Sequence, residues 1–218
     1  MSMKNIVIVG AGGFGREVAS LLKRINKRVP TWNFVGFYDD DILGKPKGSC
    51  NEYGQVLGTV NDLNDTPFEI SAVLALGSPR ALKAIRERLT NPLVKFPNII
   101  APEASILDED NYQIGEGNIL GSFSSISCNV HIGSFNVFNN RVSLGHDVEI
   151  GNYNVFMTAA RISGSSQIGI GNLFGVSSIV IPGMEVGEGV TVSPGSVIMR
   201  KPKDYSTYVG NPAKILKF

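Results

Sequence analysis

Hydrophobic residues follow one pattern up to about residue 97 and another pattern from residue 98 onward. In the first part, short apolar runs alternate with segments whose apolar residues recur every three or four positions. The pattern predicts the strands Asn5–Val9, Phe34–Tyr38, Ala72–Leu76 and Val94–Phe96, and helices over residues 16–26 and 79–89. Residues 43–56, which are rich in Gly, Pro, Ser and Asn, are typical of a loop. Strands that alternate with helices indicate an α/β domain with a parallel sheet.

From about Ile99 onward the pattern changes, and between residues 114 and 198 a large apolar residue occupies every sixth position. The fifteen positions from 114 to 198 that keep this period all hold Ile, Leu, Val or Phe. Ile-Gly or Val-Gly pairs also recur every 18 residues, starting at positions 114, 132, 150, 168 and 186. Eighteen extended residues span about 60 Å, or three sides of about 20 Å, so a triangular coil would bury one large side chain on each side. The pattern predicts a parallel β-helix of about five coils over residues 98–218, including a C-terminal tail.

The corners of such a coil need residues that can reverse the chain locally. The residue after an inward-facing position is often glycine, as at Gly133, Gly145 and Gly151. Because glycine adopts positive φ without strain, we expect these glycines to form the corners through positive φ. The residues two positions before the inward-facing ones are mostly small or modest in size, such as Asn136 and Ser166, and would fit where three walls converge.

Composition narrows the class of protein. The chain has 218 residues, 43% of them hydrophobic, and a formal net charge of +1. This charge gives no basic surface for nucleic acid or for an acidic membrane. No apolar stretch approaches the roughly 18 residues of a membrane span, and the apolar start of the chain leads directly into a glycine-rich turn rather than a cleavage site. Two cysteines are too few for a disulfide scaffold. We therefore expect a cytoplasmic protein.

A glycine-rich turn follows the first predicted strand. Gly10–Gly15 has the spacing G-x-G-x-x-G before a predicted helix, a combination that can hold phosphate. Asp39 and Asp40 end the second strand, and Gly77 and Arg80 follow the third, at the carboxyl edge where such sheets bind ligands. A nucleotide-dependent oxidoreductase is disfavoured, since the domain is about half the size of a full dinucleotide fold and no residues for hydride transfer follow. A purely structural turn with solvated aspartates is the alternative.

His146 is a candidate catalytic base, because an imidazole can accept a proton near neutral pH without any special surroundings. It comes two residues after the inward-facing Leu144, so it should be exposed just after a corner. Asp147 could hold the imidazole tautomer. Neighbours on a straight strand point to opposite faces, so this pairing requires the corner to turn both side chains outward. His146 as an ordinary surface histidine is the alternative, and His131, the other histidine, is expected at the surface or in a subunit contact.

Together these features resemble a known family. The hexapeptide period, the α/β front half with Gly10–Gly15 and the tail Gly210-Asn211-Pro212-Ala213-Lys214 are similar to the sugar O-acyltransferase family of sialic-acid O-acetyltransferase type, which includes bacterial nucleotide-sugar N-acetyltransferases. The resemblance implies a Rossmann-like domain over residues 1–97 followed by a left-handed parallel β-helix over 98–218. It also implies acetyl-CoA as co-substrate and a homotrimer with active sites between subunits. In this family a base stands four residues before an Ile-Gly pair and precedes an acid, as His146 and Asp147 do.

The resemblance also assigns binding residues. Those implied to bind the nucleotide sugar are Gly12, Gly13, Phe14, Asp39, Asp40, Gly77 and Arg80. Those implied at the coenzyme are Val155, Gly164, Val176 and Pro194. Gly164 would hold the thioester carbonyl, Val176 and Pro194 would line the pantetheine arm, and Val155 stands where many relatives carry a second histidine. No metal site is expected, because two poorly spaced histidines do not supply the three that a trimeric carbonic anhydrase needs.

The expected function is acetyl-CoA-dependent N-acetylation of a nucleotide-linked amino sugar in surface-glycan biosynthesis. O-acetylation of a sugar or sialic acid is the first alternative, because the sequence does not separate an amine acceptor from a hydroxyl. A non-catalytic β-helix that binds nucleotide sugars is the second alternative. Neither nucleic acid nor a membrane is an expected partner.

Overall fold

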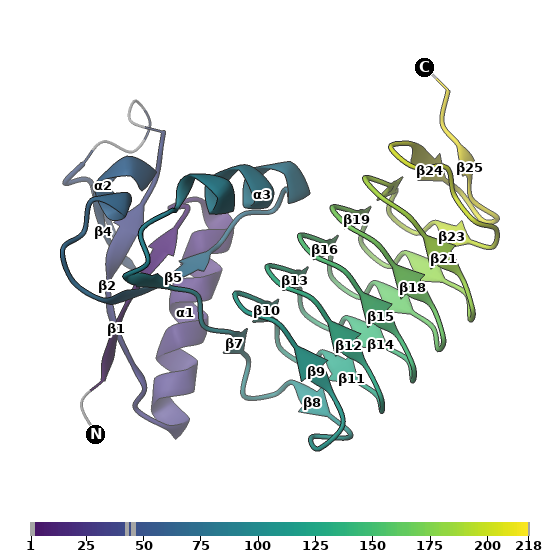
Figure 1. Cartoon of the computed structure of the whole chain (residues 1–218), viewed down its shortest axis with the longest axis horizontal. Coiled ribbons are helices and arrows are strands. Elements are labelled where there is room, and N and C mark those ends of the chain that lie inside the picture. The colour runs from purple at the N-terminus through teal and green to yellow at the C-terminus, as the bar shows by residue number, and fades with distance from the viewer. Residues whose placement is uncertain (1–2, 42–43, 45–46, 218) are drawn as a thin grey trace. The chain divides into compact units, whose positions relative to one another are not determined.

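The computed structural model describes residues 3–41, 44 and 47–217, and the chain divides into two compact units. The first unit comprises Met1–Gly77 and Ala81–Pro102, and the second comprises Ser78–Arg80 and Glu103–Phe218. Figure 1 shows an α/β sheet at the start of the chain and a stack of triangular coils in the later part. The predicted fold class, an α/β domain followed by a β-helix, is therefore confirmed.

The first unit is built on a six-stranded sheet with the order β3-β4-β2-β1-β5-β6. All its neighbouring strands are parallel except β3 and β4. Its elements are β1 (Lys4–Val9), α1 (Gly13–Arg28), β2 (Trp32–Tyr38), β3 (Cys50–Asn51), β4 (Gly54–Gly58), α2 (Val60–Asn64), β5 (Ile70–Leu74), α3 (Pro79–Arg88), β6 (Val94–Lys95) and β7 (Ile99–Ile100). The chain leaves β1 toward β2 on one side and leaves β5 toward β6 on the other. The carboxyl ends of β1 and β5 therefore form a topological switch point, where sheets of this kind bind ligands.

The composition of residues 43–56 predicts a loop, but the structure shows that this segment is not a plain loop. It contains β3 and the start of β4, while residues 43, 45 and 46 lie outside the described part of the chain. The Oδ1 atom of Asn51 accepts hydrogen bonds from the backbone N–H groups of Tyr53 and Gly54, at 2.8 and 3.1 Å, and so closes a hairpin. Residues that favour turns dominate the composition of this segment. The short strands β3 and β4 nevertheless pair with each other on either side of the turn.

The second unit is a parallel β-helix with three faces. The first face contains β10 (Ile119–Leu120), β13 (Val137–Phe138), β16 (Val155–Phe156), β19 (Leu173–Phe174), β22 (Thr191–Val192), β24 (Thr207–Val209) and β25 (Lys214–Ile215). The second contains β8 (Ser105–Ile106), β11 (Ser125–Ile126), β14 (Ser143–Leu144), β17 (Arg161–Ile162), β20 (Ile179–Val180) and β23 (Val197–Ile198). The third contains β9 (Gln113–Ile114), β12 (His131–Ile132), β15 (Glu149–Ile150), β18 (Gln167–Ile168) and β21 (Glu185–Val186). Paired residues are mostly 18 positions apart, as the sequence period predicts. The spacing is 20 between β8 and β11 and 16 between β22 and β24, near the two ends of the solenoid.

The interior of the solenoid is filled by the periodic apolar residues. Fourteen of the fifteen are buried, and Ile114 at the edge is half-buried. Phe138, Phe156 and Phe174 stack with ring centroids 4.8 Å apart, because the strand spacing sets the ring spacing. A second buried column consists of asparagines. The Nδ2 group of Asn154 donates to the Gly169 carbonyl at 2.9 Å, so the polar side chain satisfies a corner backbone.

The corners differ from the sequence expectation in one respect. The glycines that follow the inward-facing residues are not the positions of positive φ. A methyl group on Gly151 would lie 2.5 Å from the Gly169 carbonyl oxygen, so these glycines permit close contact between successive coils. Positive φ occurs two residues later, often at non-glycine residues such as Phe135 (φ +58°) and Asp147 (φ +56°). This shift decides the direction in which Asp147 points.

Candidate active site

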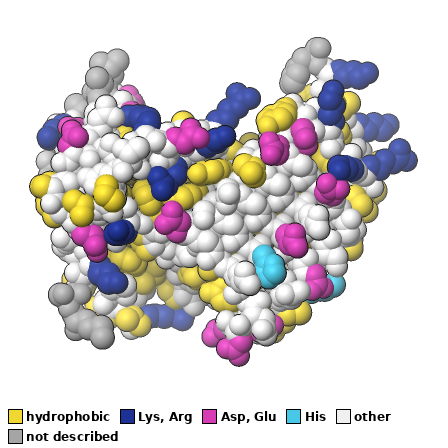
Figure 2. Space-filling view, viewed as in Figure 1, with side chains coloured by type: hydrophobic (Ala, Val, Ile, Leu, Met, Phe, Trp, Pro, Cys, Tyr) yellow, Lys and Arg dark blue, Asp and Glu magenta, His cyan; other side chains and the backbone are white. Residues whose placement is uncertain are grey.

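His146 lies at a corner of the solenoid, between β14 and β15. We call residues 145–148 and their counterparts in the neighbouring coils the His146 corner. The His146 carbonyl accepts from the backbone N–H of Ser165 in one neighbouring coil, at 2.8 Å, and the Asp147 N–H donates to the Cys128 carbonyl in the other, at 3.1 Å. The His146 side chain is 61% exposed, and Figure 2 shows histidine side chains at the surface close to acidic ones. A fixed backbone therefore presents an accessible imidazole.

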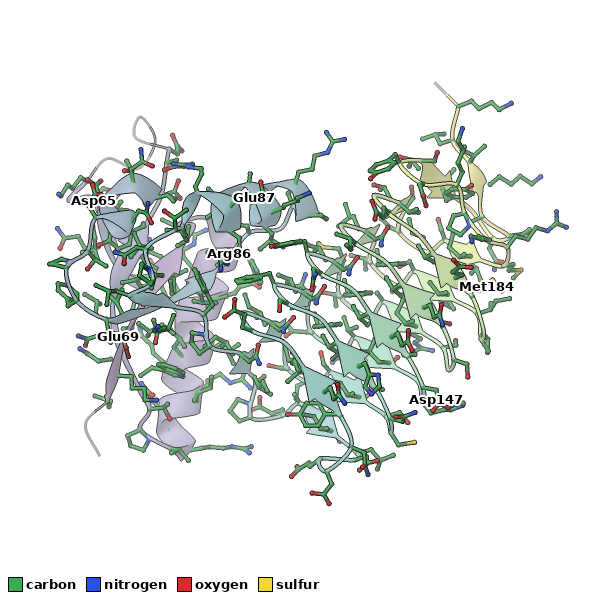
Figure 3. The ribbon with its side chains drawn as sticks, in the orientation of Figure 1. Asp65, Glu69, Arg86, Glu87, Asp147 and Met184 are labelled. Carbon is green, nitrogen blue, oxygen red and sulfur yellow. The ribbon has the colours of Figure 1, made fainter. Side chains whose placement is uncertain are left out.

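Asp147 forms a hydrogen-bonded pair with His146. The His146 Nδ1 and the Asp147 Oδ2 are 2.7 Å apart, and Figure 3 shows Asp147 projecting from the edge of the coils. The positive φ of Asp147 turns its side chain to the same side as its neighbour, which a straight strand could not do. When Nδ1 carries the proton and donates it to the carboxylate, Nε2 keeps its lone pair and can act as a base.

Asn129 also contacts the carboxylate, and this residue was not among those predicted from the sequence. Its Nδ2 donates to the Asp147 Oδ1 at 2.7 Å from the adjacent coil. The hydrogen bond from Asn129, together with the hydrogen bond and the charge of His146, holds the pKa of Asp147 below its ordinary value. The one signal in the sequence is spacing, since Asn129 stands 18 residues before Asp147 and therefore in the same column.

Gly164 lies beside the His146 ring in the adjacent coil. A methyl group built on Gly164 would be 2.7 Å from the ring Nε2, so the ring position depends on a residue without a side chain here. Among the residues that the structure describes, the Gly164 N–H has no hydrogen-bond acceptor. An uncommitted N–H next to a base can stabilise an oxyanion that forms nearby.

We expect Gly164→Ala to lower kcat about tenfold, because the added methyl would displace the imidazole from its position. The backbone of Gly164 does not have positive φ, so alanine should not strain it. Steady-state kinetics would measure the effect. In a His146→Ala background the same substitution should cost nothing further, since the ring is absent. An equal additional loss in that background would contradict the steric explanation.

The other residues implied at the coenzyme do not lie at the His146 corner. Val176 and Pro194 are exposed and lie at the corner between the first and second faces. The second face, about 20 Å wide, separates that corner from the His146 corner. Val155 is fully buried on β16 and offers no side-chain surface to a ligand in this chain. A single chain therefore brings Gly164, but not Val176 or Pro194, to His146.

His131 is exposed on β12, between Gln113 of β9 and Glu149 of β15. It lines an open groove of about 700 Å³ along the third face. This groove does not include the His146 side chain. The two histidines thus have different surroundings, which makes His131 a useful control residue.

In the first unit, the glycines of the switch point are of two kinds. A methyl group on Gly10 would lie 2.8 Å from the Ala75 carbonyl oxygen, and one on Gly15 would lie 1.9 Å from the Gly10 carbonyl oxygen. These two glycines are required by packing. Methyl groups on Gly12 and Gly77 would meet no atom within 4 Å, and one on Gly13 would meet only the end of the Arg16 side chain, at 4.0 Å. Packing therefore does not require glycine at Gly12, Gly13 or Gly77, whose backbones face open space.

The N-terminus of α1 opens at the same place. Gly12 is the N-cap residue and has no side-chain cap, and the first turn, which includes Phe14, contains no acidic residue. The Asp39 Oδ2 accepts from the backbone N–H of Ala11 at 2.7 Å, so the end of β2 holds the glycine-rich turn. The positive end of a 16-residue helix is therefore available to an anionic group.

Asp40 and Arg80 have different surroundings from Asp39. The carboxylate of Asp40 accepts from the Val60 N–H at 3.0 Å and pairs with Arg88. Burial alone would raise the pKa of Asp40, but the contacts with Arg88 and Val60 outweigh it and hold this pKa below the ordinary value. Asp40 is thus already engaged within the fold. Arg80 is exposed in the first turn of α3.

Among the described residues, the structure has neither a cluster that could hold a metal ion nor a helix that could span a membrane. No group of three or more His, Cys, Asp or Glu side chains there could hold a metal ion. Within the same ranges, none of the helices combines the length and apolar character needed to cross a bilayer.

Comparison with known proteins gives two kinds of match. Residues 5–89 match the model of the PglD N-terminal domain. The acetyltransferase domain of PglB from Neisseria gonorrhoeae, solved with acetyl coenzyme A, is 27% identical, with a TM-score of 0.86 over 99% of this chain and 100% of that one. WeeI from Acinetobacter baumannii is 27% identical, with a TM-score of 0.79 over 99% and 100% of the two chains. A comparison with curated proteins gave no significant match.

A third solved structure shows the same fold at lower identity. It is a mutant of perosamine N-acetyltransferase from Caulobacter crescentus in complex with CoA and GDP-perosamine. It is 22% identical and has a TM-score of 0.86 over 100% of this chain and 99% of that one. These full-length matches confirm the expected left-handed form of the β-helix.

Proposed function

We propose that this chain is one of the left-handed β-helix acyltransferases that carry a PglD N-terminal domain, and that it transfers an acetyl group from acetyl-CoA to an amino sugar linked to a nucleotide. The observation that carries the proposal is the His146–Asp147 pair, whose exposed imidazole lies close to Gly164 of the adjacent coil, a residue whose N–H has no acceptor among the described residues. The related PglB domain, solved with acetyl coenzyme A, supports the choice of donor.

In the proposed reaction, the sugar amine attacks the thioester carbonyl carbon. His146 Nε2 accepts the proton that the amine loses, and Asp147 stabilises the resulting imidazolium. The Gly164 N–H stabilises the oxyanion of the tetrahedral intermediate. This intermediate collapses to the amide and releases coenzyme A, whose thiolate takes up the proton. Holding both substrates in place supplies further acceleration.

The nucleotide part of the acceptor is assigned to the first unit. Gly12, Gly13 and Gly77 surround open space at the switch point, so a ligand can approach their backbones closely. The uncapped N-terminus of α1 suits a diphosphate, which is the anionic group of a nucleotide sugar. Phe14 and Asp39 flank this turn, whereas Asp40 would have to leave its contacts with Arg88 to bind a ligand.

A homotrimer is part of the proposal. Val176 and Pro194 lie one side of the triangle away from His146, so one chain cannot line the thioester and the pantetheine arm together with these residues. A neighbouring copy could bring its Val176 corner against the His146 corner, and cyclic symmetry would repeat the site three times. Sedimentation equilibrium would test the assembly, and a monomer at full activity would exclude it.

We expect Gly12→Ala to raise the KM for the nucleotide sugar about tenfold and to leave the KM for acetyl-CoA unchanged. The added methyl meets no protein atom, and the φ of −73° suits alanine, so the loss would come from the ligand side. Gly15→Ala is the matched control for a packing glycine. Because its methyl would overlap the Gly10 carbonyl oxygen, it should lower the melting temperature instead. A Gly12→Ala variant with an unchanged sugar KM would remove this turn from the proposed site.

The decisive experiment for the function is a thiol-release assay with acetyl-CoA across a panel of nucleotide sugars. Thiol release with amino sugars, and an amide in the product by mass spectrometry, is the expected result. Release with hydroxyl acceptors alone would make the enzyme an O-acetyltransferase. Binding of nucleotide sugars without any thiol release would indicate a non-catalytic scaffold. Hydride transfer from NADH would instead identify an oxidoreductase.

A further inference from the structure

We infer that Asn129 is a positioning residue for the His146–Asp147 pair, acting through its hydrogen bond to the carboxylate. The inference rests on the proposed function of that pair. Asn129 touches neither His146 nor any reacting atom, so its effect on catalysis would pass through Asp147. It would fix the carboxylate, and thereby the tautomer and the direction of the imidazole.

The geometry gives Asp147 two anchors. Its Oδ2 lies 2.7 Å from the His146 Nδ1, and its Oδ1 accepts from the Asn129 Nδ2, also at 2.7 Å. The Asp147 side chain is 50% exposed, so surrounding packing alone does not immobilise it. With one hydrogen bond, the carboxylate could rotate together with the imidazole ring, which is itself 61% exposed. With two, from residues on different coils, the plane of the carboxylate is defined.

The backbone explains why the two side chains meet. Asn129 has a φ of +53° and Asp147 a φ of +56°, and they occupy the same position in successive coils. Side chains that leave the backbone from equal conformations on stacked coils run side by side. A short amide and a short carboxylate then meet end to end without a change in either backbone.

Asparagine is common at positive φ, so a purely conformational role has to be weighed. The same column contains Ser165 (φ +58°) and Gly183 (φ +70°), so the corner does not require asparagine. Other corners hold Phe135, Arg141 and Ala159 in the same conformation. What the amide of Asn129 supplies beyond its backbone is the donor to Asp147.

The test compares two variants of Asn129, one that preserves the backbone conformation and one that preserves the shape of the side chain. Asn129→Gly keeps the positive φ without strain and removes the amide. Asn129→Asp keeps the shape but loses the donor and places a second carboxylate beside Asp147. We expect kcat to fall about tenfold in Asn129→Gly, the factor of one hydrogen bond to a charged group, and further in Asn129→Asp. The KM for acetyl-CoA should not change, and His131→Gln on β12 of the third face should be fully active.

A direct readout separates positioning from structure. In a His131→Gln background the protein has a single imidazole, and nitrogen-15 NMR can report its tautomer without any substrate. The unsubstituted site should hold the Nδ1–H form, and Asn129→Gly should shift the neutral ring toward Nε2–H. Carbon-13 NMR should show the pKa of Asp147 rising in the same variant, because a donor to the carboxylate has been lost.

The outcomes are distinguishable. Unchanged kcat and unchanged tautomer in both variants would overturn the inference. If Asn129→Gly alone failed to fold, the kcat and the tautomer of Asn129→Asp would decide: a change in both would support the inference, and no change would overturn it. If the unsubstituted protein released no thiol with any acceptor, the proposed function would fail, whereas the tautomer shift would still test whether Asn129 positions the pair.

Discussion

Replacing His146 by alanine is expected to lower kcat/KM for acetyl transfer at least a hundredfold. A general base contributes about 10²- to 10⁴-fold, and among the described residues at this corner no other histidine could replace it. The side chain is 61% exposed, so its removal leaves no cavity and the melting temperature should stay within a few degrees. Thiol release under saturating amino sugar, measured beside a thermal melt, checks both statements.

His131→Ala is the matched control for this substitution. It removes the other histidine, which is also exposed on the solenoid but lies on β12 of the third face rather than at the His146 corner. We expect its kcat/KM to be unchanged. A fully active His146→Ala variant would end the assignment of the base. Equal losses in both variants would indicate a general effect of removing surface imidazoles rather than catalysis at one corner.

Phe156→Ala should destabilise the solenoid by about 3–5 kcal/mol, the usual loss for a large aromatic side chain in a packed core. Phe156 is fully buried and stacks on Phe138 and Phe174, so the cavity would lie in the middle of the column. Each coil contacts only its neighbours, so a gap there weakens the coils on both sides. Urea unfolding followed by far-UV circular dichroism would measure the loss.

Two comparisons make this stability measurement specific. Phe123→Ala removes the same kind of side chain where it is 62% exposed, and should change stability by less than about 1 kcal/mol. The fluorescence of Trp32, the single tryptophan, follows the first unit separately and should be unaffected. A Phe156→Ala variant as stable as Phe123→Ala would show that the stacked rings do not contribute the expected free energy of unfolding.

Periodicity made the solenoid readable from the chain alone. Triangular coils bury one residue at every sixth position. The six-residue period therefore predicts three faces per 18-residue coil, and it also predicts which residues of successive coils pair. Burial of Phe138, Phe156 and Phe174 follows from that register. The first unit was less completely readable. The strand β5 begins two residues before the predicted one, and the hairpin of β3 and β4 was missed, because short pairings depend on neighbours distant in sequence.

The candidate site, too, was predicted from the sequence only in part. The order of residues identified His146 and Asp147 as candidates, since their position after Leu144 puts them at a corner, and their catalytic roles stay predictions. It misplaced the positive φ, which lies at Asp147 and not at Gly145. That conformation belongs to the stacked corner as a whole, so the residue type alone could not reveal it.

By itself, then, the sequence determined the period, the inward-facing residues and the exposed histidine, because each depends on spacing along one chain. Only the tertiary structure decided that Asn129 meets Asp147, that the His146 ring lies over Gly164, and that Val176 lies on another corner. These relations arise between successive coils or across a face. They depend on how side chains leave the backbone in three dimensions, which spacing does not specify.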